Sequence, residues 1–538
     1  MTAPALSTSP RRWWALAALA LSVLIIGLDG TIINVALPTV ARDLDASNSQ
    51  LQWISGGYLL TLSAVMLPVG ILGDRFGQKR LLLTGISLFG VASLVGALVD
   101  STGALITVRA VLGVGAAMIM PLSMALLNRI FAKEELSKAI ATWTAAAALG
   151  MPVGPVVGGW LLDHFWWGSI FLFNIPVVVI ALVAAAWLLP SDRDAAVSQV
   201  KEKAQAASFD ALGAVLGGLA ITALVYGTIL VPEDGWGSSG VIVSLIAGVA
   251  LAAGFVVRER TYAHPLVDLK LFSHRGFLWG TLVAIFGNFA IMGILFVVPQ
   301  YLQGVLGSDA LGTGVRVLPM MGGLLVAATL SENLMPRLGA RIVMPAGLVL
   351  LAAGALLGAR TDSGDGYGFT ALWLSVAGLG FGMVMVPATS MALSSLTTEN
   401  SGQGASLLET VQQLGGVLGV AGLGSLLSAG FLDRLSVTGL PEPAADAARE
   451  SVTASNAVAD QLKNPELLAS GHAAFIHGVS LVLIAVAVLS LVSAVFAALF
   501  LPSRGAVAPA DAAETTEDSG SVPAPGAQTS EAGKSTLV

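Results

Sequence analysis

The chain has 538 residues, of which 55% are hydrophobic and only 11% are charged, and its mean hydropathy is +0.83. A soluble domain usually carries about 25% charged residues, so this composition excludes a soluble globular enzyme and a disordered chain. The net charge of −7 without a basic block argues against a nucleic-acid partner, and the absence of cysteine excludes disulfides and thiolate metal sites.

Long apolar stretches follow one another along most of the chain. A helix that crosses a bilayer needs about 20 predominantly apolar residues. Fourteen stretches fit, at 13–37, 51–73, 81–99, 104–127, 138–162, 168–189, 209–231, 240–257, 276–299, 311–333, 342–358, 370–395, 403–430 and 473–501. The runs are continuous rather than alternating, which predicts an all-α membrane protein and not a β-barrel. The first run lacks a small-residue cleavage site, so we expect a retained helix rather than a signal peptide.

The placement of lysine and arginine predicts the orientation. With the N-terminus in the cytoplasm, 19 of the 26 basic residues fall in cytoplasmic segments and five in external loops. Both termini are then cytoplasmic. The expected segments are a cytoplasmic tail 1–12, a six-helix half 13–189, a two-helix insertion 190–275, a six-helix half 276–501 with an external loop 431–472, and a disordered cytoplasmic tail 502–538.

The two six-helix halves resemble each other at a shift of about 265 residues. Gly113-x-Gly115 in the fourth span recurs as Gly380-x-Gly382 in the twelfth, and the basic loop after the second span recurs after the tenth. Matched spans have the same orientation, so the repeat is parallel. Two parallel halves are the plan of a secondary transporter, whose substrate site lies between them near the bilayer midplane.

A Gly-Asp-Arg-x-Gly loop joins the second and third spans. Its glycines allow a tight turn, and its basic residues also fit a simple positive-inside anchor. An anchor alone does not explain the spacing, so we expect a conformational latch formed by Gly73, Asp74, Arg75, Gly77, Lys79 and Arg80.

This loop resembles the signature loop of the major facilitator superfamily. Leu28-Asp-Gly-Thr-Ile-Ile-Asn-Val-Ala-Leu-Pro38 resembles the first-helix motif of its fourteen-helix drug/proton antiporters, and Gln52-Trp53 and the segment 171–176 fit the same family. The match covers about residues 13–500. It implies a major-facilitator fold with two six-helix halves and two central inserted helices. It also implies that the protein exports small lipophilic compounds. The energy source would be the proton gradient, with no bound cofactor.

Two charged residues lie inside apolar spans of the first half. A carboxylate such as Asp29 costs about 2.5–3.5 kcal/mol at the bilayer centre, so it should face a cavity or a partner. Proton coupling, binding of a cationic substrate and a structural hydrogen bond all fit. Arg109 lies near the external end of its span, where snorkelling is an alternative, while the resemblance assigns it to proton transfer. A contact between Asp29 and Arg109 is a further hypothesis.

A stripe of small residues and prolines runs along the fifth span. It comprises Gly150, Pro152, Gly154, Pro155, Gly158 and Gly159. Glycines four residues apart leave one helical face bare, which permits close helix contact, so packing alone explains the stripe. The resemblance adds that this Gly-Pro pattern is typical of exporters within the superfamily.

Glu409 is an acidic residue in the thirteenth span, where the repeat has Thr144 in the first half. It fits either a polar contact between helices or a second carboxylate that binds a cationic substrate or a proton. Asn174 either lines a cavity or bonds between helices. Other possible cavity-lining residues are Asn34, Trp53, Asn288, Phe289 and Gln412.

These features predict a bacterial cytoplasmic-membrane transporter that exports small lipophilic drugs or antibiotics, either neutral or cationic. Its partners are a small-molecule substrate, protons and the lipid bilayer, and one chain with both halves fits a monomer. No nucleotide-binding or metal-binding motif is present. Export or flipping of an endogenous lipid, siderophore or secondary metabolite is the alternative, and a membrane-embedded enzyme or sensor is a remote one.

Overall fold

The computed structural model describes residues 11–131, 133–190, 210–262, 265, 269–362, 364–395 and 401–501, and in these ranges it contains helices and no strand. The expected tails before residue 11 and after residue 501, and most of the linker into the insertion, fall outside the described residues. The side chains of Asp74, Arg75 and Pro152 are also outside them.

Six long helices form the first half. They are α1 (Arg11–Asp43), α2 (Asn48–Phe76), α3 (Gln78–Gly96), α4 (Thr102–Ile130), α5 (Lys133–His164) and α6 (Ser169–Leu188). The turn between α1 and α2 is fixed by a capping box, in which Ser47 accepts from the Gln50 amide and the Gln50 side chain accepts from the Ser47 amide. Gly77 ends α2 with a φ of 105°, a conformation that residues with a Cβ rarely adopt, so the chain turns directly into α3.

The insertion is a helical hairpin of α8 (Ala211–Asp234) and α9 (Ser239–Thr261). Asp210 caps α8, because its side chain accepts a 2.8 Å bond from the amide of Gly213. The same carboxylate pairs with Arg258 near the end of α9, at 2.8 Å from Oδ1 to Nε. One residue thus starts α8 and ties the two open ends of the hairpin together.

The second half follows a short 3-10 helix, η3 (Leu269–Ser273). Its long helices are α10 (Arg275–Gly304), α11 (Ala310–Leu338), α12 (Ala340–Gly358), α13 (Tyr367–Ser394), α14 (Ser401–Arg434) and α17 (Pro465–Phe500). Gly339 ends α11 with a φ of 78° and leads directly into α12, as Gly77 does between α2 and α3. The repeat seen in the sequence is therefore also present in the backbone at this turn.

The external loop expected at 431–472 is partly helical. It contains α15 (Glu442–Glu450) and α16 (Val452–Leu462), and α17 begins within it at Pro465. The buried residues of α16 are Val452, Ser455 and Ala459, whose spacing places them on one helical face. These side chains are small, which is why the segment carries no strong core pattern in the sequence.

Every predicted span coincides with a long helix. Among the described residues, twelve of these helices are long and apolar enough to cross a membrane. The other two are α2 and α5, for which crossing stays a prediction. The observed fold is thus an all-helical membrane bundle with about twelve candidate spans.

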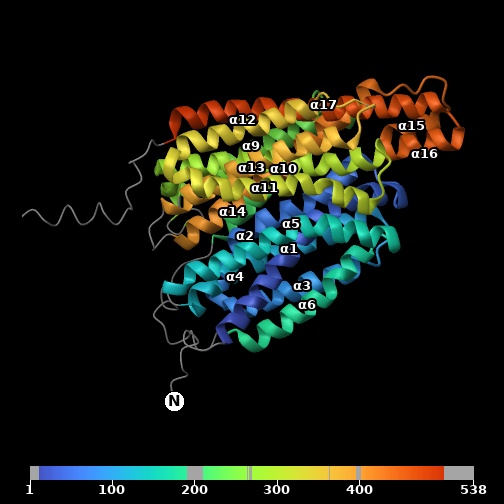
Figure 1. The fold of residues 1–538 in the computed structure, drawn as a ribbon. Coiled ribbons are helices and arrows are strands. Elements are labelled where there is room, and N and C mark those ends of the chain that lie inside the picture. Colours follow the sequence, from blue (N-terminus) through green and yellow to red (C-terminus); the bar gives the residue numbers. More distant parts are fainter. Residues whose placement is uncertain are drawn as a thin grey trace, which may run out of the picture.

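The two halves lie side by side with their long helices roughly along one direction (Figure 1). The start of α1 and the end of α17 lie at the same end of the bundle, and α15 and α16 lie at the opposite end, which we call the α15–α16 end. Between the halves, α1 contacts α10, α2 contacts α14 and α5 contacts α11. The inserted helix α8 contacts both α2 and α14.

Candidate functional site

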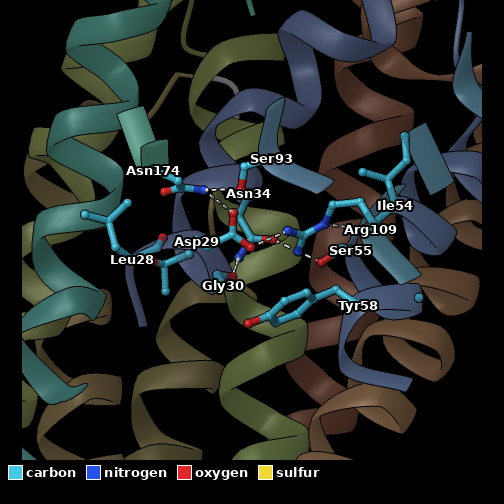
Figure 2. Close-up of polar contacts among 12 residues, drawn as sticks. Leu28, Asp29, Gly30, Asn34, Ile54, Ser55, Tyr58, Ser93, Arg109 and Asn174 are labelled. Carbon is cyan, nitrogen blue, oxygen red and sulfur yellow. Dashed lines mark hydrogen bonds and ion pairs between the residues drawn. The ribbon is translucent and has the colours of Figure 1, made fainter. Parts of the chain in front are cut away.

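A buried ion pair lies in the middle of the first half (Figure 2). Arg109 Nη1 of α4 is 2.7 Å from Asp29 Oδ2 of α1, and each side chain is 1% exposed. Arg109 Nε also donates to the carbonyl of Ile54 at 3.0 Å, and its guanidinium lies 4.3 Å from the ring centroid of Tyr58. The hypothesised contact between Asp29 and Arg109 is therefore present, and snorkelling of Arg109 is wrong because the side chain points inward.

The second oxygen of Asp29 has its own partner. Asn174 of α6 donates through Nδ2 to Asp29 Oδ1 at 3.1 Å, and the same nitrogen is 3.3 Å from Ser93 Oγ of α3. Residues of α4 and α6 thus hold the carboxylate of α1, and α3 is joined to them through Asn174. Of the two roles that the sequence left open for Asn174, bonding between helices is the one observed. The sequence could not select it, because the partner lies 145 positions away.

A second polar contact follows further along α1. Asn34 Oδ1 accepts a 3.1 Å bond from the hydroxyl of Ser55, and both residues are buried. This bond joins α1 to α2 about a turn and a half beyond Asp29. The polar positions of α1 therefore hold the helices of the first half together.

The glycine stripe packs α5 tightly against α1 on both sides of Asp29. A Cβ at Gly150 would lie 2.7 Å from the carbonyl of Leu24, and one at Gly154 would lie 2.8 Å from the carbonyl of Leu28 and would overlap Thr31. Gly158 faces Ile32 in the same way. Close packing explains these glycines fully, and it fixes the position of the α1 segment that carries Asp29.

Two further stripe residues, Pro155 and Gly159, lie against the second half. A Cβ at Gly159 would overlap Ala310 at the start of α11, and one at Gly314 of α11 would overlap the carbonyl of Pro155. Asp163 at the end of α5 accepts from the amides of Ala310 and Leu311, each at 3.1 Å. An anion at a helix N-terminus is favourable, so Asp163 joins the halves at the α15–α16 end. Sequence reasoning missed Asp163 because it stands at the end of a span.

A polar cluster in the second half comprises Glu409, Gln412 and Gln413 of α14 with Asn288 and Thr389. Gln413 Nε2 donates to Glu409 Oε1 at 3.1 Å, and Glu409 is half-buried. Asn288 Nδ2 donates to the carbonyl of Gln412 at 2.6 Å, and Gln412 Nε2 is 3.3 Å from the Thr389 hydroxyl. In the described part of the chain no arginine or lysine forms an ion pair with Glu409.

This cluster borders the first half. A Cβ at Gly416 would lie 3.0 Å from Asn288 Nδ2 and 3.6 Å from Leu59 Cδ1 of α2. Phe289 is half-buried and its backbone packs against Gly419. Trp53 instead faces the insertion, with its ring 6.2 Å from that of Tyr226. Asn288 and Gln412 therefore lie at the boundary between the halves, whereas Trp53 lies against α8.

The predicted latch loop makes contacts within the first half. Lys79 Nζ donates to the carbonyls of Ala186 and Leu189, at 2.7 and 2.8 Å, and so caps the end of α6. Gly73 accepts from the amide of Gly77 at 2.9 Å and packs against Leu122 of α4. Arg80 is exposed. The latch function itself stays a prediction.

Two matched six-helix halves, the first of which holds a buried ion pair, define a membrane carrier. A family model described as Major Facilitator Superfamily matches residues 19–420. The chain belongs to the major facilitator superfamily, and it is a transporter and not an enzyme.

Curated relatives are resistance and export proteins. The chain is 34% identical over 506 residues to a tetracenomycin C resistance and export protein of Streptomyces glaucescens, covering 92% of each chain. It is 32% identical to the multidrug efflux pump LfrA of Mycolicibacterium smegmatis, covering 90% of this chain and 96% of that one. A puromycin resistance protein of Streptomyces alboniger is 34% identical over 77% of this chain and 81% of its own.

Solved structures share the fold. A bacterial homologue of the human lysosomal transporter Spinster, in an inward-facing and unoccupied conformation, has a TM-score of 0.64 at 17% identity, covering 91% of this chain and 97% of that one. A D-xylose–proton symporter has a TM-score of 0.59 at 13% identity, covering 91% and 98%. At these identities the likeness extends to the fold alone.

Proposed function

We propose that this protein exports small lipophilic drugs or antibiotics from the cytoplasm by proton-driven alternating access. The observation that carries the proposal is the Asp29–Arg109 pair, because ionisable residues inside a membrane bundle mark ion or proton pathways. The names of the relatives, which describe drug export and resistance, support the direction and the substrate class.

The proposed topology has fourteen crossings of the bacterial cytoplasmic membrane with both termini in the cytoplasm. The α15–α16 end is then external. Contacts between the halves gather there, including Asp163 with Ala310, and Gln303 Nε2 with the carbonyl of Val35 at 2.9 Å. These contacts support an inward-facing state, closed outside. Because one chain holds both halves, the proposed working unit is the monomer.

In the proposed cycle, Asp29 is the proton carrier. When Asp29 is ionised, Arg109 and Asn174 each hold one of its oxygens. Protonation removes the charge that Arg109 faces, and a buried charge without its partner is unfavourable by about 3–5 kcal/mol. The neutral acid thus favours a rearrangement of α1 against α4, and this links protonation to the change of conformation.

Glu409 is the proposed site for the positive charge of cationic substrates. It is half-buried beside Gln413, about one turn before Gln412, and has no cationic partner in the described residues. A lipophilic cation with an amine or delocalised charge would supply that partner. Neutral substrates would use the apolar and amide surfaces instead.

Export of an endogenous secondary metabolite is a second candidate function. The S. glaucescens relative is named for both resistance to and export of tetracenomycin C, so self-protection and drug efflux can use one carrier. Deletion of the gene in its native host separates them, since accumulation of a host metabolite inside the cells supports this alternative and unchanged metabolite levels oppose it.

Purified protein in inside-out liposomes tests the proposal. An imposed proton gradient should drive uptake of a cationic dye, and collapse of the gradient should stop it. Glu409→Gln should lower the rate for the cationic dye while a neutral antibiotic is still transported, because only the cation loses a charge partner. The control Glu409→Asp keeps a carboxylate at this position. No gradient-driven movement of either compound by folded wild-type protein would contradict the proposal.

Asn174 offers a test of how the Asp29 carboxylate is held. Asn174→Leu removes the hydrogen bond that Asp29 Oδ1 accepts from α6 and leaves a buried oxygen without this donor. The rate of gradient-driven export should therefore fall, with the dye affinity unchanged. Ser93→Ala, which removes only the more distant contact to Asn174, is the milder control. An unchanged export rate in Asn174→Leu would show that this bond does not contribute to the cycle.

A further inference from the structure

Two pairs of helices join the halves, α2 with α14 and α5 with α11, and we call each line of contact a seam. The two seams differ in what covers them on the outside. The α2–α14 seam is bridged by the inserted helix α8. The Ser425 hydroxyl of α14 donates to the carbonyl of Thr228 at 2.7 Å, and a Cβ at Gly218 would lie 3.7 Å from Ala64 of α2. The ring contact of Trp53 with Tyr226 adds a third point. The insertion is thus attached to both halves along this seam.

Exposed apolar side chains also differ between the α2–α14 seam and the α5–α11 seam. Among the described residues, α2 exposes one large hydrophobic side chain, Phe76 at its end, and α14 exposes none. The helices α8 and α9 expose many instead, and so form the lipid-facing surface here. The helices of the opposite seam, α5 and α11, are themselves exposed, at Leu149, Val153, Trp160, Val315, Leu325, Val326, Leu330 and Leu338.

The α5–α11 seam is closed at one end and uncovered at the other. Gly314 of α11 is buried against Pro155 at the α15–α16 end. Leu325 lies three turns further along the same row of α11 and is 50% exposed. The neighbouring row, Val315 and Val326, is exposed at both ends, at 47% and 61%. The row from Gly314 to Leu325 is therefore buried at the α15–α16 end and exposed toward the opposite end of the bundle.

The face of helix α5 beside this seam is exposed on both sides of its contact with Gly314, because Trp160, one turn after Val156, is 47% exposed. Val156 lies beside Gly314, with its amide 3.1 Å from a Cβ added there. Leu149 lies two turns earlier on the same face of α5 and is 55% exposed. In the proposed topology Leu149 borders the seam at mid-bilayer, and Leu325 borders it on the side of the inner leaflet. By contrast, Ser63 and Met66 in the corresponding part of α2 are each 1% exposed.

We propose that lipophilic substrates dissolved in the inner leaflet enter the space between the halves through the α5–α11 seam, between Leu149 and Leu325, and that α8 closes the α2–α14 seam to them. This inference rests on the proposed export function. The exposed, uncharged leucines suit compounds with a large hydrocarbon or aromatic surface, which partition into the bilayer before they reach the carrier.

The natural absence of cysteine makes the route testable with single-cysteine variants. Leu325→Cys is modified with a bulky group through a reducible disulfide, and Val326→Cys, the adjacent lipid-facing position, carries the same group as control. In inside-out liposomes with a membrane-partitioned dye, the group at position 325 should slow export about tenfold, equivalent to about 1.4 kcal/mol. The group at position 326 should leave the rate near that of the unmodified protein, and reduction should restore the rate at 325.

A second measurement separates a blocked route from a damaged site. Dye binding in detergent solution, where the bilayer is no longer the source, should be unchanged by either modification. Equal slowing at both positions, no slowing at 325, or loss of detergent binding would each overturn the proposed route while leaving gradient-driven export by the unmodified variants intact. If folded wild-type protein fails to export the dye at all, the proposed function fails, and the route fails with it.

Discussion

Asp29→Asn is expected to abolish gradient-driven export while exchange of substrate between the two sides continues. Asparagine has the shape of the protonated acid but cannot release a proton, so the cycle would lose its link to the gradient. Conformational change driven by substrate alone would remain possible. Uptake of a labelled substrate into preloaded liposomes, measured with and without a proton gradient, distinguishes coupled from exchange transport.

The same variant leaves Arg109 buried without its charged partner, at a cost of about 3–5 kcal/mol if the structure does not adjust. Thermal unfolding should therefore be measured alongside transport. Asp29→Glu, which keeps a carboxylate near Arg109, is the matched control and should retain part of the coupled rate. Full gradient-driven export by Asp29→Asn would remove Asp29 from the coupling mechanism.

Gly154→Val is expected to have the largest effect on the fold. Its side chain would enter α1 at the hydroxyl of Thr31 and the carbonyl of Leu28. The carbonyl is part of the helix backbone and cannot move aside as a flexible side chain could. Overpacking of this kind usually costs about 1–3 kcal/mol, and here it would also displace the α1 segment that holds Asp29. We expect a clear loss of thermal stability and of transport.

The matched control is Gly254→Val in α9, because no heavy atom lies within 4 Å of a Cβ added at Gly254. Both changes place the same residue inside a long helix, so the intrinsic helix cost is shared. The difference between their unfolding temperatures in detergent then measures the α1–α5 contact. Equal stability of the two variants would mean that α5 can move away from α1 without penalty.

The sequence predicts the long helices and the repeat well because both depend on local or periodic signals. Apolar length marks each span, and Gly77 and Gly339 recur at matched turns because both adopt a positive φ. The orientation and the assignment of proton coupling follow from charge placement and family resemblance, and they stay predictions.

The partners of the charged residues could not be predicted with the same certainty. Asp29 bonds to Arg109 of α4 and to Asn174 of α6, and Asn174 in turn contacts Ser93 of α3. No local pattern encodes contacts between positions 80 or more apart. The position of α8 could not be predicted from the sequence either. Its bond from Ser425 to Thr228 joins the second half to the insertion, and periodicity alone does not show which seam the insertion covers.

Proton release on substrate binding tests the central claim most directly. Purified wild-type protein in weakly buffered detergent solution is mixed with a cationic substrate, and the pH change is followed with an indicator. If substrate and proton compete, wild-type protein should release protons at a pH where Asp29 is protonated, and Asp29→Asn should release far fewer while still binding the substrate. Binding without proton release by wild-type protein, or undiminished release by Asp29→Asn, would contradict proton coupling through Asp29.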